Sequence, residues 1–303
     1  MTRHLLSLMD LGADGLAHVL DRAAVLKTLR GSPDHPRPLT GKSVGLLMEK
    51  ASTRTRISFE VGIGELGGHV VALAGRDLQI ARDEPLEDTS RVLSRYLHAV
   101  VVRTHGQDRL EQLARGAQVP FINALTDLYH PCQLLADLQT IAEHRSAGLD
   151  SLKVAWVGDG NNMAHSWMLA SALVGFELHI ACPDGYRPEP DVLSIAEAQG
   201  RGSIVIVDDP AAAVRGAHVV TTDVWASMGQ EEEAAARREA FDGYCVTPQL
   251  MALAHTDARF LHCLPAHRGE EVAAEVIDGP ASVVWDEAEN RLHAQKALLE
   301  YLL

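Results

Sequence analysis

The sequence predicts an α/β protein with two doubly wound parallel-sheet domains and an active-site cleft between them. At 303 residues, the chain is longer than one ordinary core requires, and it suits two domains of about 150 residues each. Short apolar runs rich in β-branched residues alternate with helical patterns. This alternation is typical of βαβ units that build a buried parallel sheet.

The first domain is expected to contain four strands and to end at a helix that links the two domains. The strands are predicted at 43–48, 69–74, 98–103 and 119–124. Pro131 then occupies a position that the first turn of a helix tolerates, and Leu134, Leu138 and Ile141 follow at helical spacing. We therefore predict a linking helix that begins at Pro131.

Five further apolar runs predict the sheet of the second domain. They lie at 152–158, 176–182, 203–207, 218–222 and 259–264. We expect residues 1–130 to form the first domain, completed by a C-terminal helix at 287–303, and residues 131–286 to form the second. Ligands of open parallel sheets bind beyond the carboxyl ends of the strands, so the polar residues directly after these runs are the candidate functional residues.

Composition and charge favour a globular protein that acts on a small molecule. Apolar residues make up 47% of the chain and charged residues 22%, which excludes a disordered protein. The formal net charge of -14, from 27 basic and 41 acidic residues, disfavours binding to nucleic acid or to an anionic membrane surface. A local basic pocket for a small anion remains compatible with this charge.

The cysteines and the start of the chain indicate a reducing compartment. The four cysteines are widely scattered, and no Cys-x-x-Cys pair suggests a zinc ribbon or a redox motif. The first residues lack a signal-peptide pattern, and no run of 18 apolar residues occurs. We therefore expect a soluble, cytoplasmic protein with reduced thiols.

A polar segment directly after the strand 43–48 has the pattern of a phosphate-binding loop. Ser52 is a natural N-cap for a helix that ends at Gly67. The N–H groups of the first turn and the helix dipole favour an anion there. Arg54 and Arg56 cannot share one helical face, so one of them can bind phosphate while the other turns away. The alternative is an ordinary serine cap with solvated arginines.

The segment STRTRISFE, residues 52–60, resembles the carbamoyl-phosphate loop of the aspartate and ornithine carbamoyltransferase family without interruption. By this resemblance Ser52, Thr53, Arg54 and Thr55 bind the phosphate, and Thr55 also reaches the carbamoyl oxygen. The leaving phosphate gains charge as its C–O bond breaks, so preorganised donors stabilise the transition state more than the ground state.

Further segments match the same family on the carbamoyl-phosphate side. The resemblance implies that Arg103, His130 and Arg291 surround the carbamoyl oxygen and that Gln133 accepts from the carbamoyl NH₂. The other possibilities are a solvated arginine at Arg103 or Arg291 and a helix-capping role for His130. The segment His-Cys-Leu-Pro at 262–265 also matches, and it adds Cys263, beside the attacking amine, and Leu264 to the carbamoyl-phosphate site.

The segment 77–85 resembles a family loop that reaches the phosphate pocket of a neighbouring subunit. Gln79 fits the family pattern, but Ala81 and Asp83 stand where the family usually has glycine. The resemblance implies a homotrimer, or a multiple of it, in which Gln79 serves the adjacent chain's site. The two replacements restrict the backbone and leave the position of this loop open.

Two segments of the second domain resemble the amino-acid side of the family's site. The Gly-Asp-Gly-Asn-Asn motif at 158–162 follows a strand, but Met163 replaces the last glycine of a dinucleotide fingerprint, so a dehydrogenase is disfavoured. The resemblance assigns the ornithine α-carboxylate to Asn162 and the ammonium groups to Asp223. Ser227 and Met228, in a Ser-Met-Gly sequence typical of the members specific for ornithine, would help fix the α-amino end.

The resemblance therefore implies carbamoyl transfer to ornithine, in arginine metabolism, without a cofactor. His262 and Cys263 are neighbours on a predicted strand and point to opposite faces, so we expect no metal site there. A carbamoyltransferase for another amine, such as putrescine or an acylated ornithine, is one alternative. A non-catalytic relative that binds carbamoyl phosphate is another, and the physiological direction of the reaction stays open.

Overall fold

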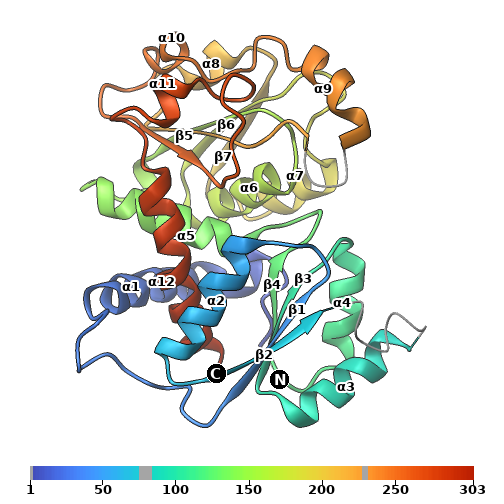
Figure 1. Ribbon diagram of the computed structural model, residues 1–303. Helices are drawn as coiled ribbons and strands as arrows, with labels where there is room; N and C mark the ends of the chain where they lie inside the picture. Colours follow the sequence, from blue (N-terminus) through green and yellow to red (C-terminus); the bar gives the residue numbers. More distant parts are fainter. Residues whose placement is uncertain (1–2, 75–83, 227–230) are drawn as a thin grey trace. The chain divides into compact units, whose positions relative to one another are not determined.

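The computed structural model describes residues 3–74, 84–226 and 231–303. The chain divides into two compact units, Met1–Gln139 with Glu289–Leu303, and Thr140–Ala288. Each unit contains one parallel β-sheet with helices on both faces (Figure 1). The predicted α/β class with two doubly wound sheets is therefore confirmed.

The sheet of the first unit has four parallel strands in the order β2-β1-β3-β4. The strands are β1 (Ser43–Met48), β2 (His69–Ala74), β3 (Ala99–Arg103) and β4 (Phe121–Leu125). The helices confined to this unit are η1 (Leu8–Leu11), α1 (Gly12–Thr28), α2 (Thr53–Glu65), α3 (Leu86–Tyr96) and α4 (Gln107–Gly116). Helices α3 and α4 cover one face of the sheet, and α1 and α2 lie on the other (Figure 1).

The alternating direction of side chains along β3 explains how α3 and α4 pack on this sheet. Val100 and Val102 of β3 point to the same face because strand side chains alternate with period two. They form an apolar cluster with Leu93 of α3 and with Leu110 and Leu113 of α4. All residues of β3 are buried, as expected for a central parallel strand with both faces covered.

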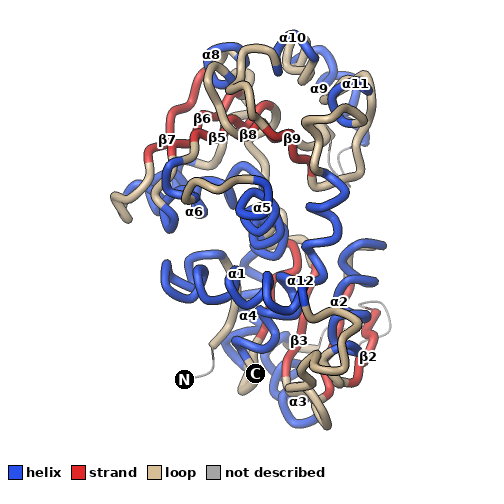
Figure 2. Tube along the Cα trace, turned by 90° about the vertical axis from the view of Figure 1, so that its left-hand side faces the viewer, coloured by secondary structure: helices blue, strands red, loops and turns tan. Residues whose placement is uncertain are grey.

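The second unit has five parallel strands in the order β7-β6-β5-β8-β9. The strands are β5 (Lys153–Val157), β6 (Glu177–Ala181), β7 (Ser203–Val207), β8 (Val219–Thr222) and β9 (Arg259–His262). Its helices are η4 (Leu149–Ser151), α6 (Asn162–Val174), α7 (Pro190–Glu197), α8 (Pro210–Val214), η5 (Glu231–Glu233), α9 (Ala234–Ala240), α10 (Pro248–Met251) and α11 (Ala274–Ile277). Figure 2 shows this sheet as a layer between α6 on one side and α8 and α10 on the other.

Two helices contribute residues to both units. They are α5 (Pro131–His144) and α12 (Val284–Leu302). The linking helix begins at Pro131 as predicted. Residues 131–139 group with the first unit, whereas the sequence-based division placed them in the second domain.

The observed strands agree with the predicted ones to within two residues at each end. The largest differences are two residues, at β4, which starts at Phe121 after a predicted start at 119, and at β9, which ends at His262 before a predicted end at 264. Leu264 has a φ of 58°, a conformation outside the β region. In the described part of the chain, no helix combines the length and the apolar character that crossing a membrane requires.

Candidate active site

The N-terminus of α2 forms an anion-binding turn directly after the carboxyl end of β1. The Ser52 hydroxyl caps the helix by accepting from the Thr55 N–H at 3.2 Å, as the sequence predicts. No acidic residue lies in the first turn. Arg54 is half-buried, whereas Arg56 is exposed and pairs with Glu60 at 2.8 Å. The two arginines therefore diverge, and Arg54 is the one placed to serve an anion at the turn.

The hydroxyl of Thr55 is where two buried arginines from distant segments meet. The Arg291 guanidinium, from α12, donates to Thr55 Oγ1 at 2.9 Å, and Arg103, at the end of β3, donates to it at 3.5 Å. Arg291 is 3% exposed and Arg103 9% exposed. The alternative of solvated arginines is therefore wrong for both. Their charges concentrate positive potential beside the first turn of α2.

Gln133 is held in one orientation by a neighbour on each side. Its amide nitrogen donates to Asp137 at 2.7 Å, and its carbonyl oxygen accepts from Arg291. A carbonyl oxygen is an acceptor with two lone pairs, the property that recognition of an NH₂ group requires. This orientation suits recognition of an NH₂ group beside the anion-binding turn.

His130 is a neutral imidazole inside this cluster. Burial lowers its pKa well below the ordinary value, and the nearby guanidinium groups of Arg291, Arg103 and Arg54 lower it further. Its Nε2 lies 3.4 Å from the Arg291 guanidinium, which can only donate. His130 therefore acts as a polar, uncharged group, and the positive charge of the site comes from the arginines.

A partly buried ion pair lies between the end of β1 and the anion-binding turn, and sequence reasoning missed it. Glu49 accepts from Arg109 at 2.7 and 3.0 Å and from the hydroxyl of Thr104. Burial acts to raise the pKa of Glu49, but these donors bring it below the ordinary value. The only local signal was a charged residue directly after a buried strand.

In the second unit, Asp223 is fixed by three donors at the carboxyl end of β8. Asn161 donates to one carboxylate oxygen at 3.0 Å, and the other accepts from Cys263 at 3.2 Å and from the Val224 N–H at 2.8 Å. Asn161 is also the N-cap of α6, because its side chain accepts from the N–H groups of Met163 and Ala164. The structure therefore brings the predicted Asp223 and Cys263 together.

Asn161 is a site residue that sequence reasoning passed over in favour of its neighbour. Asn162, the residue predicted to bind a carboxylate, is the first residue of α6, and its predicted role stays a prediction. A signal for Asn161 was present, since asparagine before a helical run is a strong N-cap. The side chain of Asn161 therefore both caps α6 and contacts Asp223.

A second carboxylate, Asp159, is buried near Asp223 and pairs with Arg237 of α9, which follows the segment after β8. Arg237 donates to Asp159 at 2.9 Å and to the carbonyl oxygen of Trp225 at 2.8 Å. Burial raises the pKa of Asp159 to about 6, Asp223 raises it as well, and Arg237 opposes both. This ion pair connects the Gly-Asp-Gly-Asn-Asn loop to the segment after β8, and sequence reasoning did not identify it.

The expectation that His262 and Cys263 point apart needs correction. Because β9 ends at His262, strand alternation does not extend to Cys263, and Asp223, His262 and Cys263 place ligand-type atoms within 4.8 Å of one another. Both nitrogens of His262 are engaged, however. Its Nε2 donates to Glu271 at 3.0 Å and its Nδ1 accepts from the Leu264 N–H at 2.9 Å. His262 therefore orients the turn that carries Cys263 and Leu264.

Three predicted site residues, Gln79, Ser227 and Met228, lie outside the described residues. Thr53 is the first residue of α2, within the anion-binding turn. The remaining predicted residues form two sets. The first unit contributes the residues around Thr55, and the second contributes Asn162, Asp223, Cys263 and Leu264.

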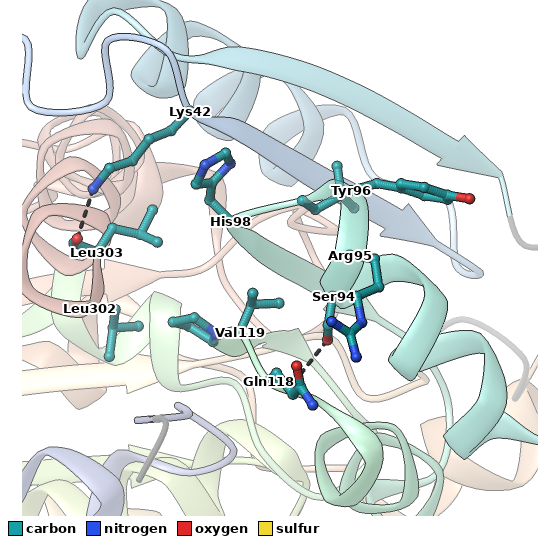
Figure 3. Close-up of a pocket in the computed structure, with 11 residues that line it drawn as sticks. Lys42, Ser94, Arg95, Tyr96, His98, Gln118, Val119, Leu302 and Leu303 are labelled. Carbon is teal, nitrogen blue, oxygen red and sulfur yellow. Dashed lines mark hydrogen bonds between the residues drawn. The ribbon is translucent and has the colours of Figure 1, made fainter.

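A cavity in the first unit lies away from these residues. It is lined by Lys42, His98 and Val119, each directly before or close to the start of a strand, and by Leu302 and Leu303 (Figure 3). Lys42 donates to the Leu303 carbonyl oxygen at 2.7 Å. Ligands of parallel sheets bind at the carboxyl ends of strands, so this cavity at the amino ends is not the candidate active site.

Two protein-family models match the chain along nearly all of its length. Residues 3–143 match the carbamoyl-P binding domain of aspartate/ornithine carbamoyltransferase, and residues 150–302 match the Asp/Orn binding domain. The first match contains the anion-binding turn and the second contains Asp223. Arg103, His130 and Gln133 also lie within the first match, whereas Arg291 lies within the second.

Individual relatives are similar over the same span. The chain is 57% identical to an ornithine carbamoyltransferase of Halorhodospira halophila, with 99% of each sequence covered, and 56% identical to one of Nitrosococcus oceani, with 99% and 97% covered. The solved structure of the Pyrococcus furiosus ornithine carbamoyltransferase superposes with a TM-score of 0.93 at 48% identity, covering 98% of this chain and 96% of that one. The chain belongs to the aspartate/ornithine carbamoyltransferase family.

Proposed function

We propose that the protein transfers the carbamoyl group of carbamoyl phosphate to the δ-amine of L-ornithine, giving L-citrulline and phosphate. The meeting of Arg103 and Arg291 at Thr55, beside the N-terminus of α2, supports this function most directly. Full-length relatives that carry the name ornithine carbamoyltransferase support the choice of acceptor.

The residues of the first unit suit a reaction in which phosphate is the leaving group. Ser52, Thr53, Arg54 and Thr55 bind the phosphate oxygens at the helix N-terminus, where the helix dipole stabilises added negative charge. Arg103, His130 and Arg291 polarise the carbamoyl carbonyl. Because these donors are held in place before the reaction, they stabilise the developing charge without reorganising.

The residues of the second unit suit an amino-acid acceptor. Asp223 orients the ornithine amine, Cys263 lies beside it, and Asn162, Ser227 and Met228 bind the α-amino and α-carboxylate end. An alkyl ammonium has a pKa of about 10.4, so roughly one molecule in two thousand carries the free amine near neutral pH. The amine attacks the carbamoyl carbon, the tetrahedral intermediate collapses, and the departing phosphate takes the proton.

A citrulline assay with several acceptors tests this function. Purified protein and carbamoyl phosphate are incubated with ornithine, putrescine, acetylornithine or aspartate, and the carbamoylated product is measured. We expect product with ornithine and little with the other three. Equal kcat/KM for putrescine and ornithine would support the alternative of a different amine. An inactive protein that still binds carbamoyl phosphate would support a non-catalytic relative.

We also propose that the active protein is a cytoplasmic homotrimer, or a multiple of it, acting in arginine metabolism in either direction. Ile57 and Val61, one helical turn apart on α2, are 53% and 39% exposed, and β2 is an edge strand of its sheet. An apolar helix face and an open edge beside the anion-binding turn suit a subunit contact. In such a trimer Gln79 enters the neighbouring subunit's phosphate pocket.

Subunit mixing tests the shared site. Arg54→Ala disables a chain's own pocket, whereas Gln79→Ala disables only the group that the chain lends to its neighbour. Co-expression of the two variants should therefore restore activity in some sites of the mixed trimers. Activity no higher than that of either variant alone would exclude a site shared through Gln79, and a monomer in solution would exclude the trimer.

A further inference from the structure

Helices α2 and α12 are in close contact within the first unit, at a glycine. A Cβ atom on Gly62 of α2 would lie 3.1 Å from the Cγ of Lys296 and 3.3 Å from the Cδ1 of Leu292. Both of these residues belong to α12. The missing side chain therefore lets the stem of Lys296 lie directly against the backbone of α2.

Lys296 is fully buried, and its ammonium is paired with the last residue of α2. Its Nζ lies 2.7 Å from a carboxylate oxygen of Glu65 and 3.1 Å from Nε2 of His35. Nδ1 of His35 lies 3.0 Å from the Pro36 carbonyl oxygen, so Nδ1 donates and Nε2 is left to accept. Arg30 also donates to Glu65, at 3.0 Å. The ammonium is thus held between two acceptors from different segments.

Helix α12 contacts α2 near both ends of α2. Arg291 donates to Thr55 in the first turn of α2, and Lys296 pairs with Glu65 in the last turn. Between them, Leu292 and Lys296 lie against Gly62. Two polar contacts on either side of a close helix crossing determine both the rotation and the axial position of α2 relative to Arg291.

A buried ion pair is weak evidence for stability. Removing two charges from water costs about as much as their attraction returns, and apolar replacements of similar volume are often neutral or stabilising. In some proteins such pairs instead specify one arrangement among several similar packings. Here the specified arrangement is that of the helix whose N-terminus forms the anion-binding turn.

We propose that Lys296 is a positioning residue for the anion-binding turn: through Glu65 and His35 it fixes α2 so that Arg291 and the first turn of α2 bind the same molecule of carbamoyl phosphate. This inference rests on the proposed function of that turn. Lys296 acts through α2 and does not touch the substrate. Loss of the pair leaves the fold intact and loosens the turn.

Two variants remove the pair from opposite sides. Lys296→Met keeps the apolar stem against Gly62 and removes the ammonium. Glu65→Gln is nearly isosteric and retains all helix packing, so it keeps the test valid should Lys296→Met fold poorly. Glu300→Gln is the matched control, because Glu300 pairs with Arg22 at 2.9 Å and ties α12 to α1 instead of α2.

Inorganic phosphate is the probe for the turn, titrated calorimetrically into the full-length protein, and steady-state kinetics give the two KM values. We expect the phosphate Kd and the KM for carbamoyl phosphate to rise about three- to tenfold in both variants, because a displaced turn binds less well. The KM for ornithine should stay within about twofold, since α2 carries none of the acceptor residues. Glu300→Gln should leave all three constants near the wild-type values.

Three outcomes overturn the inference. Unchanged phosphate Kd and carbamoyl-phosphate KM in both variants would show that the pair does not position the turn. An equal rise in both KM values, or the same rise in Glu300→Gln, would indicate general loosening of the fold. Equal phosphate Kd values for the wild type and for Arg54→Ala would instead show that the turn does not bind phosphate. That result would exclude the proposed role of the turn, and the inference with it.

Discussion

At the scale of single residues, the proposed chemistry depends on where a few charges are held. Thr55 accepts from Arg103 and Arg291, and the neutral His130 beside them leaves the positive charge to the guanidinium groups. In the second unit, Asp223 keeps its carboxylate oriented through Asn161 and Cys263. The role of each cluster can be tested by a substitution that removes one of these charges.

Arg54→Ala should lower kcat by about a hundredfold or more, the usual loss when one preorganised donor to a developing oxyanion is removed. Arg56→Ala is the matched control, because Arg56 is exposed and pairs with Glu60 on the same helix. Steady-state citrulline formation measures both. A loss of less than about threefold for Arg54→Ala would exclude a transition-state role.

Asp223→Asn should lower kcat/KM for ornithine by about tenfold or more, because a hydrogen bond to a charged group contributes about 1.5–3 kcal/mol. The amide has nearly the same shape as the carboxylate. The KM for carbamoyl phosphate should change little, since Asp223 belongs to the second unit. Asp184→Asn, at a side chain that is 97% exposed, is the control. An unchanged ornithine kcat/KM for Asp223→Asn would contradict the acceptor assignment.

At the scale of elements, the loop after β5 is positioned by backbone contacts that tolerate little change. Gly160 donates its N–H to the Tyr186 carbonyl oxygen at 2.8 Å. A Cβ there would lie 2.3 Å from the Pro188 nitrogen and 2.4 Å from the Arg187 carbonyl carbon. The loop that carries Asp159 therefore requires a glycine at this position.

Gly160→Ala should destabilise the protein by about 1–3 kcal/mol, as overpacking against rigid backbone generally does, and should raise the KM for ornithine. Gly64→Ala, in α2, is the control. A Cβ at Gly64 meets no atom within 4 Å, and alanine in a helix is about 0.5–1 kcal/mol more stable than glycine. Thermal unfolding midpoints should therefore move in opposite directions. A midpoint for Gly160→Ala at or above that of the wild type would exclude the clash.

Helix α12 carries a buried histidine that links stability to pH. Burial and the nearby ammonium of Lys296, opposed by Glu289, together lower the pKa of His293 to about 4. The unfolded chain protonates this histidine at a pH of about 6.5. Between these two values the unfolded state holds the extra proton, so the free energy of unfolding falls as the pH is lowered from about 6.5 to about 4.

His293→Gln should reduce by about one the number of protons that the chain takes up on unfolding over that pH range. The variant's free energy of unfolding should therefore fall less steeply with acidification than that of the wild type. Urea unfolding at several pH values measures both slopes. Identical slopes would show that His293 titrates alike in the folded and unfolded states.

At the scale of the whole molecule, local sequence patterns predicted the fold and the loops, and long-range contacts remained hidden. The strand at 43–48 and the Ser52 cap could be predicted because alternation, capping and helix starts depend on near neighbours. The Arg291–Thr55 contact joins residues 236 positions apart, so no local pattern reveals it. The roles of Arg103 and Arg291 came from the family resemblance.

Other features were out of reach for equally physical reasons. The Arg237–Asp159 pair depends on which way a long side chain turns after folding. The proximity of Cys263 to Asp223 depends on β9 ending at His262, and strand ends are the least predictable part of a strand. Asn161 was predictable in principle as an N-cap, although its bond to Asp223 was not.

The central claim is that the carbamoyl carbon of carbamoyl phosphate becomes bonded to the side-chain nitrogen of ornithine. Carbon-13 NMR with carbamoyl phosphate labelled at its carbonyl carbon, and ornithine labelled with nitrogen-15 at the δ position, observes this bond directly. We predict that the wild-type protein produces a ureido carbon split by one-bond coupling to the labelled nitrogen, with phosphate released in equal amount. An uncoupled product carbon, or decay of carbamoyl phosphate at the same rate with and without ornithine, would contradict the assigned function.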